Sequence, residues 1–442
     1  MVTAVPRLVI AAPSSGSGKT TIATGLMAAF RARGMRVSPH KVGPDFIDPS
    51  YHALATGRPG RNLDAFLCGT ELMEPLFLHG AQDVDIAIVE GVMGLYDGAT
   101  GLGELASTAQ AAKLLDAPVV LVVDARAVGR SIAALVSGFA AYDPQVRIAG
   151  IIVNKVGSAT HEAILRDALL PLGIPVVGVL TRDDRLAMPA RHLGLVPVAE
   201  RQRDAAQSID RLAAAVTAGC DLGALLAIAS SARPLSAAAW EAPAARTPSP
   251  SPVVAVAGGP AFSFVYAEHL EMLTGLGAEV RLLDPLVDES LGQAAALYLP
   301  GGFPEMYAAD LSANELLRKE IAAFDGPIVA ECGGLLYLVS SLDGEPMCDV
   351  VRAEAALGGR LSLGYRTATA ISDSPAAARG DVVRAHEFHY SVASPPAGEP
   401  AAWQIGDRVE GFASAGLHAS YLHTHWAGTP TAPRRLLAAA SR

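Results

Sequence analysis

The sequence predicts an α/β protein with two domains, residues 1–232 and 253–442, joined by a linker at residues 233–252. The 442 residues are too many for one ordinary domain, and 51% of them are hydrophobic, which is enough material for two cores. The linker is rich in proline, serine and alanine, a composition typical of an extended, semi-rigid connection. An apolar strand pattern begins directly after it, so a second domain is expected there.

The first domain is predicted to alternate between strands and helices. Its apolar runs are nearly continuous, which is typical of strands buried on both faces, and alanine-rich helical segments lie between them. Strands are expected at residues 8–12, 35–38, 84–90, 119–124, 148–154 and 176–180, and helices at residues 21–33, 105–115 and 131–141. This order predicts a parallel sheet with helices on both faces. Ligands of such sheets bind at the carboxyl ends of the strands.

A phosphate-binding loop of the P-loop NTPase type is predicted at residues 13–20, between the first strand and the first helix. Backbone N–H groups of the loop and the helix N-terminus would face an anion. Lys19 would reach the outer phosphates, and the Thr20 hydroxyl would hold Mg²⁺. Pro13 occupies the place of the first glycine of the usual pattern, and a glycine-rich turn without a ligand is the alternative. The residues expected to bind ATP here are Gly16, Ser17, Gly18, Lys19, Thr20 and Thr21.

Carboxylates that would complete this site follow two other strands. Asp45 and Glu90 are the candidates to hold Mg²⁺ beside the Thr20 hydroxyl, as an ATP site requires. Asp48 and Asp97 lie a few residues further along the same two segments and are candidates for contact with the substrate. Ordinary surface carboxylates are the alternative for both.

Two further polar features of the first domain could contact ligands. Asn154 ends an expected strand, where its amide offers a donor and an acceptor to a purine base, although a strand-terminating role is an equal alternative. Basic residues after strands could pair with carboxylates of the substrate, and Arg61 is the candidate retained here. The other basic residues of this kind are Lys113, Arg126 and Arg130.

A cysteine nucleophile is predicted in the second domain at Cys332. It lies on a sharp turn between an expected strand and a helix, which would expose the thiol and lower its pKa in the field of the helix N-terminus. The N–H of Gly333 would serve as an oxyanion donor, and Gly302, in the glycine-rich loop 300–305, would supply a second donor. A small buried hydrophobic residue is the alternative for this cysteine. Strands are expected at residues 253–257, 280–283, 297–299 and 328–330, with helices at residues 266–276 and 335–340.

A general base for the thiol could be His418, His423 or His425, close to the end of the chain. Another polar cluster, residues 386–389, contains two histidines and a glutamate but lacks the HExxH spacing of a zinc site. We interpret that cluster as a structural or interface motif.

Composition and charge exclude several classes of protein. The net charge of −10 argues against a protein that coats nucleic acid. The four cysteines form no CxxC pair, so we expect neither a disulfide framework nor a zinc site, and we expect a reducing cytoplasm. Neither a signal peptide nor a membrane span is predicted. A homodimer is left open.

In combination, these motifs resemble the cobyrinate a,c-diamide synthases, a family that includes the hydrogenobyrinate enzymes of the aerobic vitamin B12 route. The resemblance extends over almost the whole chain. It implies a dethiobiotin-synthetase-like ATP domain followed by a class I glutamine amidotransferase domain. The segments that carry it are residues 13–20, 41–49, 90–98, 300–305, 331–334 and 419–425.

The resemblance also implies roles for the candidate residues. Thr20, Asp45 and Glu90 would lie near Mg²⁺, Cys332 would be the nucleophile, and His423 its base, because residues 421–423 match the Tyr-x-His of related corrin glutaminases. Many class I glutaminases have His-x-Glu, whereas His425 stands at the third position here. Either another group orients His423, or the site works as a dyad. The glycine that usually precedes Glu331 is replaced by Ala330.

The implied reaction is an ATP- and glutamine-dependent amidation, performed by a glutamine-hydrolysing carbon–nitrogen ligase. Its substrates would be the a and c acetate carboxylates of cobyrinate or hydrogenobyrinate, with Mg²⁺, ATP and L-glutamine required. The alternatives are a cobyric acid synthase, a nickel-sirohydrochlorin diamide synthase, or a ParA-like ATPase without amidating activity. The cobalt content of the substrate and the order of the two amidations are left open.

Overall fold

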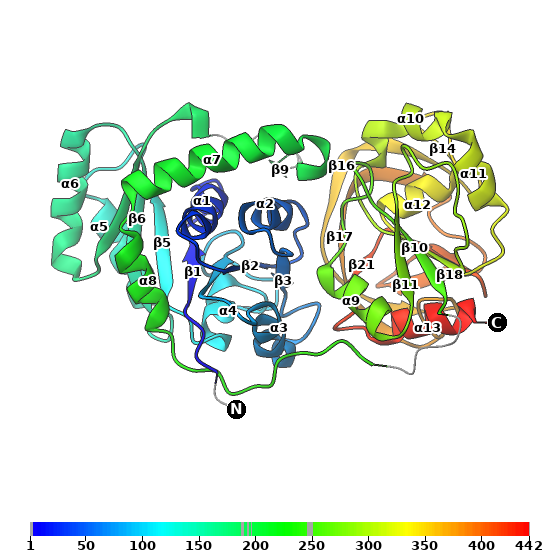
Figure 1. Ribbon diagram of the computed structural model, residues 1–442, viewed down its shortest axis with the longest axis horizontal. Helices are drawn as coiled ribbons and strands as arrows, with labels where there is room; N and C mark the ends of the chain where they lie inside the picture. The colour runs from blue at the N-terminus through cyan, green and yellow to red at the C-terminus, as the bar shows by residue number, and fades with distance from the viewer. Residues whose placement is uncertain (1–2, 187–189, 192–193, 196, 245–250, 442) are drawn as a thin grey trace. The chain divides into compact units, whose positions relative to one another are not determined.

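The computed structural model describes residues 3–186, 190–191, 194–195, 197–244 and 251–441 (Figure 1). The chain divides into two compact units, Met1–Trp240 and Glu241–Arg442, each with its own sheet. Among the helices in these described ranges, none is long and apolar enough to cross a membrane.

The first unit is built on a seven-stranded parallel sheet with the order β3-β2-β4-β1-β5-β6-β7. Strands β1, β2 and β4 are buried along their whole length, which explains the nearly continuous apolar sequence of β1 and β4. The strands are β1 (Arg7–Ala11), β2 (Val37–Val42), β3 (Arg61–Leu63), β4 (Ile86–Glu90), β5 (Val119–Asp124), β6 (Ile148–Val156) and β7 (Val176–Thr181). Two short strands, β8 (Ala190–Arg191) and β9 (Gly194–Leu195), pair separately.

Helices cover both faces of this sheet. Figure 1 shows α1, α2 and α7 on one side and α3, α4 and α8 on the other. The helices are α1 (Lys19–Ala32), α2 (Ile47–Thr56), α3 (Met73–Gly80), α4 (Thr108–Leu114), α5 (Ile132–Tyr142), α6 (Ala159–Leu169), α7 (Gln202–Gly219) and α8 (Leu222–Ser230). The doubly covered parallel sheet that the sequence predicts is confirmed.

Strand β2 differs from its predicted position at residues 35–38. It extends to Val42, so Lys41 lies within a buried strand and not in the loop after it. This strand is difficult to recognise in the sequence because it contains polar residues, which are buried only by pairing with one another and with neighbouring elements. Ser38 Oγ lies 2.9 Å from His40 Nε2, and Lys41 Nζ lies 2.8 Å from Glu90 Oε1.

The start of the expected linker is attached to the first unit. Leu235 forms a β-bridge with Thr3, and the backbone N–H groups of Ser236 and Ala237 donate to Glu74 Oε1 at 2.6 and 2.7 Å. The Trp240 ring lies against the ring of His79, 5.0 Å away between centroids. Residues 245–250, near the end of that segment, lie outside the described residues.

The second unit contains a twelve-stranded mixed sheet. Five neighbouring strands are parallel, in the order β11-β10-β12-β13-β20, and the sheet continues with mainly antiparallel pairs, although β14 pairs with β16 in parallel. The parallel strands are β10 (Val253–Ala257), β11 (Glu279–Leu283), β12 (Ala296–Leu299), β13 (Ile328–Glu331) and β20 (Leu417–Ser420). The remaining strands are β14 (Val339–Leu342), β15 (Glu345–Pro346), β16 (Val351–Ala370), β17 (Val382–Ser394), β18 (Ala401–Ile405), β19 (Arg408–Ala413) and β21 (His423–Thr424).

The antiparallel part was not predicted from the sequence. Strands β16 and β17 form a long hairpin, and β17 also pairs with the short β21. Strand β17 also lies over the turn that follows β13, where Cys332 Sγ is 3.7 Å from the Phe388 carbonyl. The helices of this unit are α9 (Ala267–Gly275), α10 (Ala308–Ala313), α11 (Glu315–Ala322), α12 (Gly333–Leu338) and α13 (Thr431–Ala440).

Two candidate active sites

The phosphate loop connects β1 to α1 and depends on two glycines with positive φ. Gly16 has φ +76° and Gly18, which precedes α1, has φ +99°. Both values favour glycine, and a Cβ on Gly18 would lie 2.3 Å from Asn154 Nδ2. Lys19 Nζ lies across the loop and donates to the carbonyls of Ser14 at 3.2 Å and Met93 at 2.5 Å. Burial and the nearby Lys41 lower the pKa of Lys19 to about 8. Thr21 follows in the first turn of α1.

Asn154 supports the loop from β6. Its Nδ2 donates to the Ser17 carbonyl at 3.0 Å, and its Oδ1 accepts from the backbone N–H of Lys155 at 2.9 Å. Lys155 Nζ donates to the Gly16 carbonyl at 2.8 Å. Both ends of the Asn154 amide are therefore engaged with the protein, which favours loop support over the reading of a base. Lys155 was not predicted, because a lysine after a strand carries no distinctive signal.

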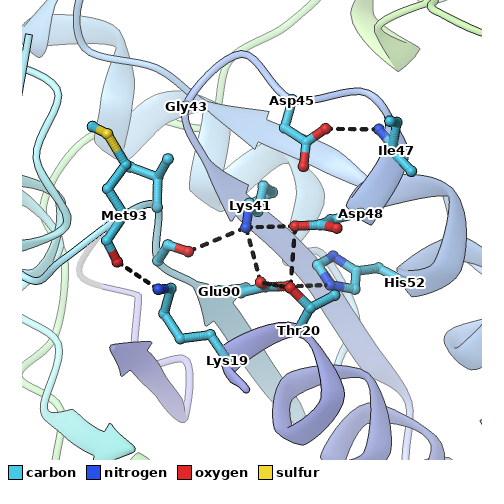
Figure 2. A network of polar contacts seen from close by, with 12 residues as sticks. Lys19, Thr20, Lys41, Gly43, Asp45, Ile47, Asp48, His52, Glu90 and Met93 are labelled. Carbon is cyan, nitrogen blue, oxygen red and sulfur yellow. Dashed lines mark hydrogen bonds and ion pairs between the residues drawn. The ribbon is translucent and has the colours of Figure 1, made fainter. Parts of the chain in front are cut away.

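Four elements bring charged side chains together beside Thr20 (Figure 2). Thr20 Oγ1 donates to Glu90 Oε1 at 2.5 Å and to Asp48 Oδ2 at 3.3 Å. Lys41 Nζ lies 2.8 Å from Glu90 Oε1 and 2.7 Å from Asp48 Oδ2. His52 Nε2 lies 2.7 Å from Glu90 Oε2. These residues come from α1, β4, α2 and β2, and sequence analysis missed Lys41 and His52 because their partners are distant in the chain.

The charges of this cluster support one another. Burial alone would raise the pKa of Glu90, but the Lys41 charge and the hydrogen bond to His52 hold it well below its usual value. Burial opposes the charge of Lys41, yet Asp48 and Glu90 raise its pKa above the usual value. Glu90 is therefore ionised and Lys41 protonated across the neutral range.

Asp45 and Asp48 lie differently from the roles expected for them. Asp48, expected to contact the substrate, reaches Thr20, whereas Asp45 accepts from the backbone N–H of Ile47 at 2.9 Å. Burial and the charge of Asp48 raise the pKa of Asp45 to about 8. The oxygen set around Thr20 therefore consists of its hydroxyl and the carboxylates of Asp48 and Glu90.

This oxygen set fits Mg²⁺, which prefers oxygen ligands and shares them with phosphates. Within the part of the chain that the structure describes, no group of three or more His, Cys, Asp or Glu side chains is arranged to hold a metal ion by itself. One or two protein carboxylates with a nucleotide are the usual Mg²⁺ arrangement in ATP sites. The donor chemistry therefore suits a cation that arrives with ATP.

The other residues expected to contact the substrate, Asp97 and Arg61, have contacts within the protein. Asp97 Oδ2 accepts from the backbone N–H of Gly94 at 2.8 Å and closes the loop after β4. Arg61 is buried in β3, and a Cβ on Gly80 of α3 would lie 2.5 Å from Arg61 Cδ. The remaining basic candidates form ion pairs: Lys113 with Asp143 and Glu104, Arg126 with Asp124, and Arg130 with Asp167.

In the second unit, Cys332 forms the turn between β13 and α12 with φ +47°, an unusual value for a residue with a side chain. The thiol is buried, 3% exposed, and Sγ lies 3.7 Å from the Phe388 carbonyl of β17. Burial and the charge of Glu305 raise the pKa of the Cys332 thiol well above its usual value. The hydrogen bond from the backbone N–H of Gly333 acts in the opposite direction but is the smaller effect. The expectation of an exposed thiol is wrong, because β17 covers the turn, and burial opposes the expected lowering of the thiol pKa.

The two expected oxyanion donors lie side by side. A Cβ on Gly333 would lie 2.9 Å from the backbone nitrogen of Gly302, and a Cβ on Gly302 would lie 2.0 Å from the Ala261 carbonyl. Only glycine fits at both positions. The loop after β12 therefore closely approaches the turn after β13, which carries Cys332.

His423 lies next to the same loop. A Cβ on Gly301 would lie 2.3 Å from His423 Cε1, and β21 pairs His423 with His386 of β17. Burial, with the charges of His386 and His389, lowers the pKa of His423 to about 3, so its imidazole is neutral. A neutral imidazole can accept the thiol proton.

The other two candidate bases contact different groups. His418 Nδ1 lies 3.1 Å from Ser374 Oγ, and His425 lies 3.6 Å from Glu268 Oε2 with its ring against Tyr266. His423 is therefore the histidine that the glycine loop beside Cys332 approaches.

The cluster at residues 386–389 belongs to β17. Glu387 pairs with Arg366 and Arg408 at 2.7 Å each, and its other oxygen lies 3.2 Å from His389 Nε2. The His389 ring stacks on Tyr421 with centroids 3.7 Å apart. These contacts fix the part of β17 that covers the Cys332 turn.

Comparisons with known proteins agree with two sites of different chemistry. Residues 8–196 match the model of the CobQ/CobB/MinD/ParA nucleotide binding domain, and residues 253–431 match that of the CobB/CobQ-like glutamine amidotransferase domain.

Full-length relatives carry both parts. The chain is 58% identical to a hydrogenobyrinate a,c-diamide synthase of Streptomyces coelicolor, over 98% of this chain and 97% of the relative. It is 51% identical to a protein of the same name in Thermobifida fusca, over 99% and 97%. A cobyrinate a,c-diamide synthase of Gloeobacter violaceus is 42% identical, over 97% and 96%.

Proposed function

Because this chain belongs to the a,c-diamide synthase family of hydrogenobyrinate and cobyrinate, we propose that its two units divide one amidation between an ATP site and a glutaminase site. The chain is a glutamine-dependent, amide-forming ligase of cobalamin biosynthesis, with ATP and glutamine as co-substrates. The observation that carries the division is the pairing, in one chain, of a phosphate loop beside Thr20, Asp48 and Glu90 with a cysteine turn beside Gly302.

In the first unit, the loop N–H groups and Lys19 bind the phosphates of ATP. Thr20, Asp48 and Glu90 would hold Mg²⁺, which supplies positive charge to the phosphate oxygens. Lys41 pairs with both carboxylates and orients them. A carboxylate oxygen of the corrin attacks the γ-phosphorus, the bond to the β-phosphate oxygen breaks, and ADP leaves. Ammonia then attacks the acyl phosphate carbon, forms the amide and releases phosphate.

In the second unit, Cys332 attacks the side-chain amide carbon of glutamine while His423 takes the thiol proton. The N–H groups of Gly302 and Gly333 stabilise the oxyanion of the tetrahedral intermediate. His423 returns the proton to the leaving nitrogen, and ammonia departs. Water then hydrolyses the thioester to glutamate and the free thiol.

The test is amidation of hydrogenobyrinate and of cobyrinate, each incubated with MgATP and glutamine and analysed by mass spectrometry. We expect two carboxylates of one or both corrins to become amides, with one glutamate formed per amide. Amidation of a nickel-sirohydrochlorin or of a corrin that already carries the a,c-diamide, without reaction of either test substrate, would reassign the substrate. ATP hydrolysis without any amide would favour the ParA-like alternative.

Three expectations remain proposals. We propose domains at residues 1–232 and 253–442, which the two matched ranges support. A homodimer stays a prediction that sedimentation of the full chain tests. The cytoplasmic location inferred from four scattered cysteines likewise stays a prediction, and cell fractionation tests it.

A further inference from the structure

A buried carboxylate lies directly beside the nucleophile in sequence. Glu331 ends β13, precedes Cys332 and is 4% exposed. Its partners come from strands that are distant along the chain. Oε1 accepts from the backbone N–H of Thr424 at 3.2 Å and from the Thr424 hydroxyl at 2.8 Å, and Oε2 accepts from the Tyr298 hydroxyl at 3.1 Å. Three donors therefore converge on one carboxylate.

A buried chain of hydrogen bonds fixes the direction of the third donor. The backbone N–H of Trp426 donates to His269 Nε2 at 3.1 Å, so that nitrogen must be the acceptor. His269 Nδ1 then carries the proton and donates to the Tyr298 hydroxyl oxygen, 2.9 Å away. The Tyr298 hydroxyl therefore donates its own proton to the hydrogen bond with Glu331 Oε2. Burial lowers the pKa of His269 well below its usual value, so its ring is neutral and one of its two nitrogens can accept.

Thr424 connects this carboxylate to the proposed base. It follows His423 in the two-residue strand β21, whose other side pairs with β17. The nucleophile turn is joined to the same segment, since the backbone N–H of Cys332 donates to the Ser420 carbonyl at 2.7 Å. The segment 420–424 is therefore hydrogen-bonded to the end of β13 and the turn after it at both of its ends. A backbone bond holds its first residue, Ser420, and the Glu331 side chain holds its last residue, Thr424.

A second buried carboxylate holds only the beginning of this segment. Glu410 accepts from Ser420 Oγ at 2.8 Å and from the backbone N–H of Tyr421 at 2.6 Å. Its contacts end two residues before His423. Glu331 is therefore the side chain that fixes the end of the segment next to the base.

We propose that Glu331 is a positioning residue for glutamine hydrolysis, because its carboxylate fixes Thr424 and thereby holds His423 in register with Cys332. The carboxylate that follows the base in His-x-Glu glutaminases is replaced here by His425. Glu331 supplies the orienting function from the nucleophile strand. This inference rests on the proposed roles of Cys332 and His423.

The structure offers a pair of matched substitutions at Thr424. Thr424→Val keeps the shape of the side chain and the backbone bond but removes the hydroxyl donor to Glu331, whereas Thr424→Ser keeps that donor. Tyr298→Phe removes a donor from the opposite carboxylate oxygen and leaves both Thr424 bonds intact. A role through Thr424 predicts that the first substitution affects catalysis most among these three.

The experiment measures kcat and KM for glutamine hydrolysis by the full-length variants, with ammonia-dependent amidation of hydrogenobyrinate as the folding control. We expect Thr424→Val to lower the glutaminase kcat about tenfold with KM little changed, as expected for a misplaced base. Thr424→Ser and Tyr298→Phe should stay within about threefold of the wild type. Glu331→Gln should lower kcat at least as much as Thr424→Val, and all variants should keep ammonia-dependent amidation.

Two results would overturn the inference. One is a wild-type glutaminase kcat in Thr424→Val. The other is an equal loss of kcat in Thr424→Val, Thr424→Ser and Tyr298→Phe, which would indicate a general packing role. The parallel variants Cys332→Ser and His423→Ala separate this outcome from failure of the proposed function, since hydrolysis that survives in either would overturn the catalytic assignment itself.

Discussion

The Thr20 hydroxyl donates a 2.5 Å hydrogen bond to Glu90 Oε1, which joins the end of the phosphate loop to the end of β4. The same carboxylate contacts Lys41 through Oε1 and His52 through Oε2. Glu90 is therefore oriented from three sides before any ligand binds. Preorganised charge of this kind contributes most to catalysis, because no reorganisation is needed during the reaction.

Glu90→Gln should lower ATP-dependent amidation about a hundredfold or more, because it removes a negative charge that the phosphate site needs. Glutaminase activity should be unchanged, since Cys332 lies in the other unit. Glu104→Gln is a suitable control, because Glu104 is exposed and pairs with Lys113 on the same unit. The test is to measure ATP-dependent amidation with an ammonium salt as the nitrogen source in the wild type and in both variants. A wild-type rate in Glu90→Gln would contradict the assignment.

His52 should tune the metal requirement of this site. His52→Leu removes the hydrogen bond to Glu90 Oε2, whereas His52→Gln can restore a donor at the same place. We expect the Mg²⁺ concentration for half-maximal amidation to rise about tenfold in the leucine variant, as for other residues that orient metal ligands. The glutamine variant should lie closer to the wild type. Equal Mg²⁺ dependence in all three proteins would rule out this role.

Asn154 should affect binding of nucleotides without selecting among them. Its amide is engaged with Ser17 and Lys155, so Asn154→Ala should loosen the loop and raise KM for ATP and GTP by the same factor. The measurement compares both nucleotides in the wild type and the variant under ammonia-dependent conditions. A change in the ratio of the two KM values would instead support the reading of a base by this amide.

Stability of the second unit should depend on pH through buried histidines. Burial lowers the pKa of His418 to about 4, from 6.5 in the unfolded chain. As the pH falls from 6.5 toward 4, the unfolded chain binds a proton that the folded chain does not, so stability is lost. Burial raises the pKa of Glu331 and Glu410 to about 7, and those two groups act in the opposite sense, adding stability as the pH falls through 7.

The contribution of His418 can be separated with one substitution. As the pH falls from 7 to 4.5, the wild type should lose about 2 kcal/mol more unfolding free energy than His418→Gln. The reason is that the unfolded variant has no imidazole at this position to bind a proton. Urea unfolding at the two pH values measures this. A stability difference that is independent of pH would show that His418 ionises equally in the folded and unfolded chains.

Local sequence was sufficient for several features. The phosphate loop could be predicted because its glycines, Lys19 and Thr20 are consecutive and lie between an apolar run and a helix. The Cys332 turn could be predicted for the same reason, since Gly333 follows directly and the strand precedes it. Most strands of the parallel sheet were recognised because burial on both faces leaves almost no polar residue in them, whereas the polar residues of β2 led to a wrong position for that strand.

Features that depend on pairing across the chain could not be predicted in this way. Lys41 can be buried because Asp48 and Glu90 balance its charge, and His52 because it is hydrogen-bonded to Glu90. Neither pairing produces a recognisable pattern in the local sequence. Asp48, and not Asp45, contacts Thr20, because Asp45 accepts from the backbone N–H of Ile47 at the start of α2. The high pKa of Cys332 depends on β17, part of an antiparallel hairpin whose many exposed positions interrupt the apolar signal.

The most direct test of the two-site account compares nitrogen sources in Cys332→Ser. The variant should lose amidation of hydrogenobyrinate with glutamine but keep the wild-type rate with an ammonium salt, because the ATP site does not use the thiol. Loss of both activities, or amidation with glutamine at the wild-type rate, would contradict the division of labour between Cys332 and the phosphate loop.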